Sequence, residues 1–318
     1  MKFSFGLPLM AHPQNPEFLT TEAVSEFARA AEAVGFDSCS LTEHPLPNDQ
    51  WLASGGHDAL DPFVALAVAA GATTRLRLLT NLTPLPYRNP AILAKTVATV
   101  DRLSGGRVIL GVGVGYLESE FEAVGVDFDQ RNALFDESLE VMRLIWTGET
   151  VNYQGLNFSI ANSTGLPTPV QSPVPVWIGG NSKLSRRRVA EKAQGWMPMP
   201  NPAALASRRR SAHLETLDQL ADMIAYLRDH AASVGRTEPI DIKYMDLEVG
   251  AVGTSGWNPE KHLENIAAQA AIGVTGMAAP ITGDTRSQVV EALQQYGEEI
   301  IAHRWQPRAL TDRQRPPA

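Results

Sequence analysis

The sequence contains a single cysteine, Cys39, among its 318 residues. One cysteine cannot form a disulfide within the chain, and it excludes a zinc site built from several thiolates. Because Cys39 lies in an apolar stretch, we expect it to be a small buried residue. His57, Asp58 and Asp61 have the residue types of a metal site, but Asp61 stands before a proline as a helix cap. We therefore predict no metal site.

Long apolar runs and an excess of positive charge are also missing. No segment reaches the roughly 18 consecutive apolar residues of a membrane span, and the apolar run in MKFSFGLPLM is too short for a signal peptide. Lys and Arg number 27 against 35 Asp and Glu, a net charge of -8. Nucleic acids and anionic membranes select clustered Lys and Arg. We expect a cytoplasmic protein that binds neither, with the basic runs at 186–188 and 208–210 on solvated helix surfaces.

Short apolar runs alternate with longer amphipathic segments over nearly the whole chain, which is typical of repeated βα units. The expected strands are 2–8, 37–44, 75–86, 107–115, 174–180, 195–200, 240–249 and 274–280. The expected helices are 20–35, 62–72, 90–106, 131–148, 182–194, 214–233, 259–273 and 285–304. Eight such pairs predict an α/β fold, a (β/α)8 TIM barrel, with an open doubly wound sheet as the alternative.

The predicted barrel is one domain, residues 1–306, and its regular alternation is interrupted once. Residues 149–173, after the fourth helix, lack a helical period and predict an insertion made of a small hairpin and an extended Pro-rich segment. The tail, 307–318, is expected to be disordered.

In a TIM barrel the active site lies at the C-terminal ends of the strands. His44 ends the second strand, where it could act as a general acid or base or serve as a hydrogen-bonded structural residue. The GGNS turn at 179–182 joins a strand to a helix and could bind phosphate or simply form a capped turn. Lys243 on the seventh strand could form a Schiff base, but we expect it to point outward.

Two stretches near the third and fourth strands are unusual. GVGVGY at 111–116 fails the dinucleotide pattern G-x-G-x-x-G, because Tyr116 or Glu118 stands where the third glycine is required. It therefore ends the fourth strand. The third strand continues through Pro84, which cannot donate a ladder hydrogen bond, so a bulge is predicted where this strand leaves the barrel.

Three blocks carry a family resemblance: LTEHP at 41–45, the segment 85–125, and PVWIGGNS at 175–182. Their order and spacing resemble the bacterial luciferase-like monooxygenase superfamily, and most closely its deazaflavin (coenzyme F420)-dependent oxidoreductases. The resemblance covers roughly residues 3 to 300. It implies a flavin-like ring bound at the strand ends, a small-molecule substrate and a homodimer. In the family a non-prolyl cis peptide bond forms the bulge of the third strand, and the matching bond here is Asn81–Leu82.

The resemblance also implies roles for individual residues. His44 matches a family active-site histidine, and the GGNS turn matches the family's phosphate-binding loop. Gly113 and Gly115 are expected to leave clearance for the ring. The cofactor-binding residues implied in this way are Asn81, Leu82, Thr83, Gly113, Gly115, Tyr116, Gly179, Gly180, Asn181 and Ser182.

Two departures from the family pattern narrow the hypothesis. Sugar-phosphate dehydrogenases of the superfamily have a glutamate where Tyr116 stands, so sugar-phosphate oxidation is not expected. The flavin-monooxygenase branch has an arginine where Val114 stands, which favours F420 over FMN. We hypothesise hydride transfer between F420 and a small organic substrate. The alternative is an FMN-dependent monooxygenase of the luciferase-like type, and a remote one is a cofactor-free barrel lyase or aldolase that uses Lys243.

Overall fold

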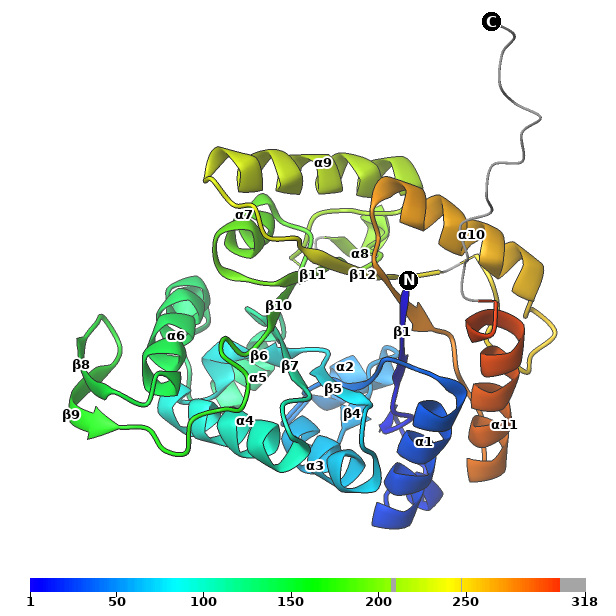
Figure 1. Cartoon of the computed structure of the whole chain (residues 1–318), viewed down its shortest axis with the longest axis horizontal. Coiled ribbons are helices and arrows are strands. Elements are labelled where there is room, and N and C mark those ends of the chain that lie inside the picture. The colour runs from blue at the N-terminus through cyan, green and yellow to red at the C-terminus, as the bar shows by residue number, and fades with distance from the viewer. Residues whose placement is uncertain (207–209, 247, 304–318) are drawn as a thin grey trace, which may run out of the picture.

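Eight parallel strands close into a barrel in the computed structural model, which describes residues 1–206, 210–246 and 248–303 (Figure 1). In order around the barrel they are β1 (Lys2–Gly6), β3 (Ser38–Leu41), β5 (Arg77–Thr80), β7 (Val108–Gly113), β10 (Val176–Gly179), β11 (Gly195–Met197), β12 (Asp241–Met245) and β13 (Gly276–Ala279). Because β13 pairs with β1 and β10 pairs with β7, no edge remains among these eight strands. The TIM-barrel prediction is confirmed, and the open sheet is excluded.

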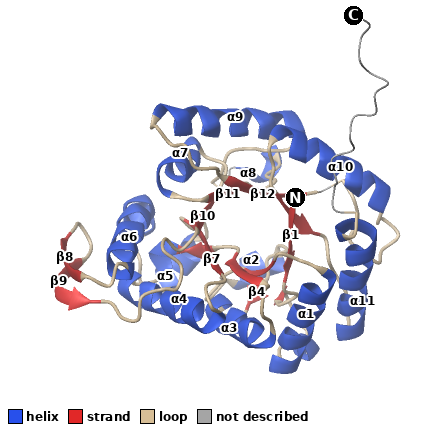
Figure 2. Ribbon diagram, viewed as in Figure 1, coloured by secondary structure: helices blue, strands red, loops and turns tan. Residues whose placement is uncertain are grey.

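Eight long helices surround the strands (Figure 2). They are α1 (Thr21–Val34), α3 (Pro62–Ala72), α4 (Pro90–Ser104), α6 (Arg131–Trp146), α7 (Lys183–Lys192), α9 (Leu217–Ser233), α10 (Pro259–Ile272) and α11 (Arg286–Tyr296). Their ends follow local signals. The Thr20 hydroxyl accepts a hydrogen bond from the Ala23 amide at the start of α1, and Gly35 ends that helix at φ 95°. All eight predicted helices are present.

Shorter elements sit between the barrel units. The insertion after α6 contains the antiparallel hairpin β8 (Thr150–Gln154) and β9 (Ser159–Thr164), as predicted. Several short elements were not predicted, and many of them follow the C-terminal ends of barrel strands. They are β2 (Met10–Ala11), η1 (Pro16–Phe18), α2 (Asp49–Ala53), β4 (Asp58–Ala59), η2 (Leu85–Tyr87), α5 (Glu118–Ala123), η3 (Phe128–Gln130), α8 (Ala203–Ala206) and the π-helical turn η4 (Gly297–Ile301).

The predicted bulge of the third strand is confirmed. β5 pairs with β7 up to Leu79, opposite Ile109, and pairing resumes in β6 (Thr83–Pro84), where Thr83 lies opposite Val112. Four steps along one strand thus match three along the other, which is one extra residue. The Asn81–Leu82 peptide bond within the bulge is cis, at the predicted position.

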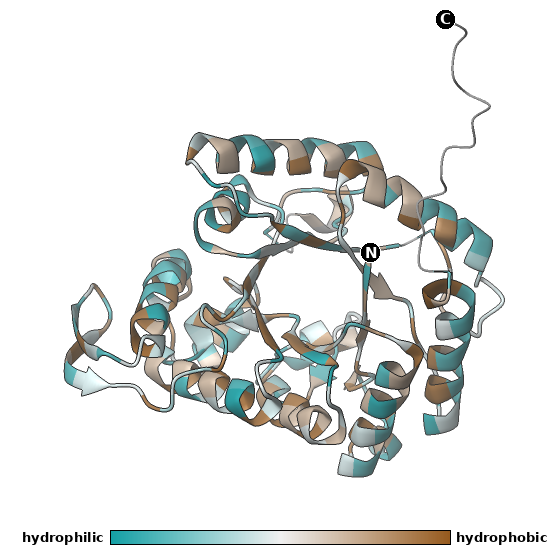
Figure 3. Cartoon of the chain, in the orientation of Figure 1, coloured by the Kyte–Doolittle hydropathy of each residue, from teal (hydrophilic) through white to brown (hydrophobic). Residues whose placement is uncertain are grey.

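The main apolar core lies between the outer faces of the strands and the helices, which carry both apolar and hydrophilic residues (Figure 3). Cys39 is fully buried, as predicted. A small second cluster fills part of the barrel interior with Leu79, Ile109, Trp177 and Met197.

Two predictions about basic residues are wrong. Lys243 is buried, because its side chain turns into the barrel rather than outward. Arg186 and Arg188 are also buried rather than solvated, because Arg186 packs over the Tyr226 ring of α9 and Arg188 pairs with Asp136 of α6. Arg187, between them, is exposed as predicted. Of the second basic run, Arg210 is exposed, while 208 and 209 lie outside the described residues. The tail 307–318 also lies outside them.

Candidate active site

His44 and Glu120 form a buried pair at the C-terminal mouth of the barrel. His44 follows β3, and Glu120 lies on α5 after β7. His44 Nδ1 is 3.1 Å from Glu120 Oε2, with the two side chains 9% and 1% exposed. A carboxylate so well shielded from water interacts strongly with a partner in contact. Glu120 therefore fixes the orientation of the imidazole ring.

Two further donors hold the Glu120 carboxylate in place. The Tyr87 hydroxyl donates to Oε2 at 3.1 Å, and the Leu46 amide donates to Oε1 at 3.3 Å. Burial, and then the charge of Glu120, raise the pKa of Tyr87, so its hydroxyl keeps its proton as the donor. A carboxylate that accepts from all sides assigns the proton of His44 to Nδ1. The other ring nitrogen, Nε2, forms no hydrogen bond with a described residue and can accept a proton.

Aromatic rings surround the imidazole of His44. The Trp51 ring on α2 lies 4.6 Å away centroid to centroid, the His57 ring 5.0 Å and the Tyr116 ring 6.4 Å. Burial, and then the charge of His44, lower the pKa of His57. Both causes favour the neutral form of His57 beside His44.

A second buried carboxylate, Glu43, holds the loop that carries His44. Arg88 Nε donates to Glu43 Oε1 at 2.6 Å, and Arg88 Nη2 lies 2.5 Å from Asp61 Oδ2. Burial raises the pKa of Glu43, and the charge of Arg88 opposes this shift. Because Glu43 is fixed by Arg88, the next residue along the chain, His44, is anchored from both sides.

The residues expected at the ring lie around the strand-three bulge, with Asn81, Leu82 and Thr83 on it. A Cβ atom at Gly113 would lie 2.7 Å from Leu82 Cδ1, and one at Gly179 would lie 2.3 Å from Leu82 Cδ2. A side chain at either position would displace the tip of the Leu82 side chain. The predicted contacts of these two glycines with a bound cofactor stay a prediction.

Gly115 and Tyr116 continue from β7 toward α5. Gly115 has φ 78°, and a Cβ atom there would lie 2.8 Å from the Phe121 ring. The left-handed conformation favours glycine and turns the chain toward the helix that carries Glu120. Gly115 therefore helps to place the partner of His44.

The GGNS turn leads directly into α7. Gly180 has φ 96°, and the Ser182 hydroxyl caps the helix by accepting from the Ser185 amide at 3.0 Å. The Asn181 side chain is fully buried and is bound to the Met199 and Ala212 backbones. Its amide is thus engaged inside the protein. The part of this turn suited to a phosphate is the positive N-terminal end of α7.

The possible metal trio does not assemble. Asp58 pairs with His12, Asp61 pairs with Arg88, and His57 packs against His44. Within the described ranges, no group of three or more His, Cys, Asp or Glu side chains is placed to hold a metal ion. None of the helices in those same ranges is both long and apolar enough for a membrane crossing.

Sequence reasoning selected His44 but missed Glu120, Trp51 and Tyr87 as its neighbours. His44 and Glu120 are 76 residues apart, and no spacing rule joins them. Glu120 does stand inside the family-like block 85–125, immediately before the apolar Phe121. An acidic residue within such a block could have indicated a partner for His44.

The closed TIM barrel, the cis bond in the bulge of its third strand and the histidine at its mouth agree with the features that the family resemblance implies. The sequence model of the luciferase-like monooxygenase family matches residues 3–315, and the chain belongs to this family.

Relatives with known sequences extend along much of the chain. An uncharacterized protein of Mycobacterium bovis is 30% identical over 307 residues, covering 90% of this chain and 99% of the relative. An F420-dependent glucose-6-phosphate dehydrogenase of Amycolatopsis mediterranei is 31% identical over 232 residues, covering 67% of this chain and 67% of the relative.

Solved structures show the same fold. The monooxygenase RslO1 of Streptomyces bottropensis superposes with a TM-score of 0.78 at 21% identity, covering 95% of this chain and 99% of that one. A type II Baeyer–Villiger monooxygenase of Pseudomonas putida in complex with FMN superposes with a TM-score of 0.76 at 17% identity, covering 96% and 99%. At these identities the likeness concerns the fold alone.

Proposed function

We propose that this protein transfers a hydride between coenzyme F420 and a small organic substrate. The observation that carries the proposal is the buried His44–Glu120 pair at the mouth of a luciferase-like barrel. The F420-dependent relative of Amycolatopsis mediterranei supports the choice of cofactor. Tyr116 stands where the sugar-phosphate dehydrogenases have a glutamate, so we do not propose a sugar phosphate as the substrate.

The residues at the mouth fit a ring with a phosphate-bearing tail. The bulge at Asn81–Thr83, with Gly113, would lie against the ring, and Trp51 and Tyr116 offer aromatic faces beside His44. Gly180 and Ser182, at the start of α7, would receive the phosphate. When bound, F420 supplies a carbon that gives or takes a hydride.

The protein's own part is to manage the proton that accompanies the hydride. His44 Nε2 forms no hydrogen bond with a described residue, so it can donate a proton to the substrate or accept one from it. Glu120 holds Nδ1, which keeps the ring oriented and stabilises the imidazolium. The surrounding aromatic side chains keep water away from this exchange.

Cofactor titration tests the proposal directly. Purified protein titrated with F420 should show saturable quenching of cofactor fluorescence at roughly micromolar concentrations. FMN is titrated in parallel, because the structurally similar Baeyer–Villiger enzyme is an FMN complex. Saturable FMN binding with consumption of O₂, and no F420 binding, would overturn the proposal in favour of a flavin monooxygenase.

The aldolase alternative is not favoured by the position of Lys243. The cavity that Lys243 lines also touches Lys2, Ser38 and Arg77, which begin their strands. This is the N-terminal end of the barrel, opposite the mouth where His44 lies. A Schiff base on Lys243 would form away from the other site residues.

Glu120→Gln should separate the positioning role of Glu120 from cofactor binding. The glutamine oxygen can still accept one hydrogen bond, but the negative charge that stabilises the imidazolium is lost. We expect the turnover number to fall about tenfold to a hundredfold, with the dissociation constant of F420 changed less than about twofold. A variant in which affinity and turnover fall together would show that Glu120 is only structural.

We also propose a homodimer in the cytoplasm, as the family resemblance implies. Light scattering on the purified protein should give twice the mass of one chain. A monomeric mass at working concentration would contradict this expectation.

A further inference from the structure

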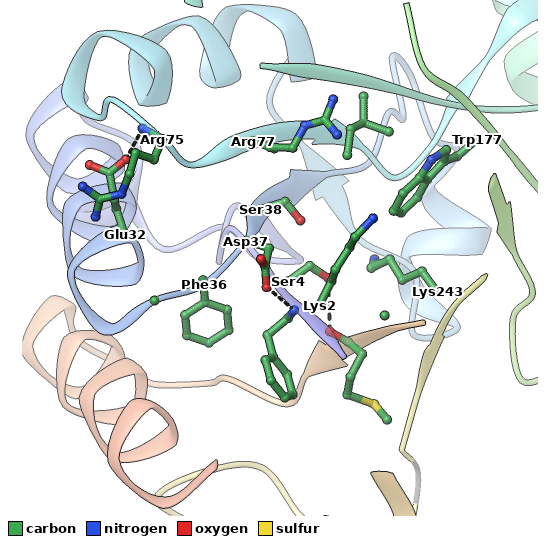
Figure 4. A pocket seen from close by; sticks show the side chains of 15 residues that line it. Lys2, Ser4, Glu32, Phe36, Asp37, Ser38, Arg75, Arg77, Trp177 and Lys243 are labelled. Carbon is green, nitrogen blue, oxygen red and sulfur yellow. Dashed lines mark hydrogen bonds between the residues drawn. The ribbon is translucent and has the colours of Figure 1, made fainter. Parts of the chain in front are cut away.

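A cavity of about 400 Å³ opens at the N-terminal end of the barrel, opposite the mouth (Figure 4). We call it the basal cavity. Residues near the N-terminal ends of several barrel strands line it, among them Lys2, Ser4, Ser38, Arg77, Trp177 and Lys243. It shares no residue with the site around His44.

The basal cavity exists because small side chains occupy inward positions. The interior of a TIM barrel is normally filled by layers of branched apolar residues. Here Ser4, Ser38 and Gly276 line the space instead. Ile109 and Trp177 close it toward the middle of the barrel, where they pack with Leu79 and Met197.

Two cations in the cavity have no carboxylate in contact. Lys243 is 6% exposed and forms no ion pair or hydrogen bond with any residue that the structure describes. Arg77 donates to the Val108 carbonyl at 3.1 Å and to Gln171 Oε1 at 2.9 Å, and both acceptors are neutral. Burial alone lowers the pKa of Lys243 to about 8. An amine held in this way gains stability when an anion reaches it.

The other charged groups around the cavity are already engaged. Lys2 Nζ pairs with Asp241 at 2.8 Å. Glu32 accepts from the backbone amides of residues 74–76, and Asp37 accepts from the Phe3 amide at 2.7 Å. The charged groups that line the cavity besides Lys243 are Lys2, Glu32, Asp37, Arg75 and Arg77. With Asp241, the partner of Lys2, three carboxylates stand against these four cations, so a net positive charge remains.

We propose that the basal cavity binds a small carboxylate with an aromatic or other flat apolar body. Its carboxylate would pair with Lys243 and Arg77, whose guanidinium matches two oxygens at once. Its apolar body would lie against Trp177 and Ile109, which belong to the apolar cluster inside the barrel. In Figure 4 the amines of Lys2 and Lys243 point toward the same part of the cavity, beside Trp177.

Calorimetric titration of the full-length protein with benzoate tests the proposal. We expect saturable binding of one benzoate per chain near neutral pH. Lys243→Met, which keeps the length of the side chain without its charge, should weaken binding at least tenfold. Lys261→Met, a control at an exposed lysine of α10, should leave it unchanged. Raising the pH to about 9 should weaken wild-type binding, because the amine loses its proton above its pKa of about 8.

A second variant protects the test against misfolding. Ser4→Leu fills the cavity without removing a charge and should also abolish benzoate binding. Circular dichroism establishes that each variant is folded. The proposal is overturned if wild-type protein gives no saturable heat up to about 10 mM benzoate. It is also overturned if a folded Lys243→Met or Ser4→Leu variant binds like wild type, or if inorganic phosphate binds and benzoate does not.

Discussion

His44→Ala is expected to lower the turnover number by about 10²-fold or more, with the fold and the F420 dissociation constant preserved. The substitution removes Nε2, the ring nitrogen that forms no hydrogen bond with a described residue. Glu120 keeps its hydrogen bonds from Tyr87 and the Leu46 amide, so the variant leaves no buried carboxylate without a donor. The loss should therefore fall on proton transfer rather than on stability.

The measurement follows F420 absorbance with a substrate that wild-type protein turns over in a screen of small alcohols and unsaturated carbonyl compounds. His230→Ala is the matched control, because His230 lies on the outer helix α9 and pairs with Glu191. That variant should retain wild-type turnover. If His44→Ala is folded and fully active, His44 has no part in the mechanism.

The pH dependence of the same reaction distinguishes a catalytic role of His44 from a purely structural one, because loss of a structural residue would leave the shape of the profile unchanged. Loss of His44 should change the shape of the profile of turnover against pH, because no other described imidazole contacts Glu120. His57 does not take its place, because it forms no hydrogen bond with Glu120 and packs instead against the side of the His44 ring. An unchanged profile would mean that a group other than His44 transfers the proton.

The barrel could be predicted because its strands are continuous apolar runs bounded by turns, and each is followed by a helix with its own cap. The face that each strand turns inward could not be predicted. β12 reads Asp-Ile-Lys-Tyr, an alternation that on a half-exposed strand would turn the polar residues toward water, but in this barrel they turn toward the interior. Lys243 illustrates this. On the sequence it resembles an outward lysine, and only the closed barrel shows that its position turns inward.

The buried arginines were missed for a related reason. Arg188 lies 3.1 Å from Asp136 Oδ1 and packs 4.7 Å from the centre of the Phe135 ring, both on α6. These partners are about 50 residues away along the chain and are brought close by the packing of α7 on α6. A run of arginines alone cannot reveal such a carboxylate. The pairing of His44 with Glu120 could not be predicted for the same reason, because the two residues are 76 positions apart in the sequence.

Gly111→Ala is expected to destabilise the protein by about 3 kcal/mol or more. A Cβ atom at this position would lie 1.8 Å from the Thr80 carbonyl oxygen and 2.8 Å from Met197 Cε. The first neighbour is backbone, and it cannot move without separating β5 from β7 at the strand-three bulge. The Thr80 hydroxyl also donates to the Gly111 carbonyl at 2.7 Å, so the two residues are joined.

Melting temperature by circular dichroism measures the effect, and a fall of about 5 °C or more is expected. Gly71→Ala is the matched control. It adds the same methyl group to a helical glycine of α3 whose Cβ would meet nothing within 4 Å, and it should be neutral or slightly stabilising. If Gly111→Ala melts like wild type, the bulge tolerates a side chain there. The first glycine of GVGVGY would then have no structural reason, and a cofactor contact at Gly111 itself would become the better explanation. The expected loss would instead show that the backbone packing of the bulge requires a glycine at this position, whether or not a ligand is bound.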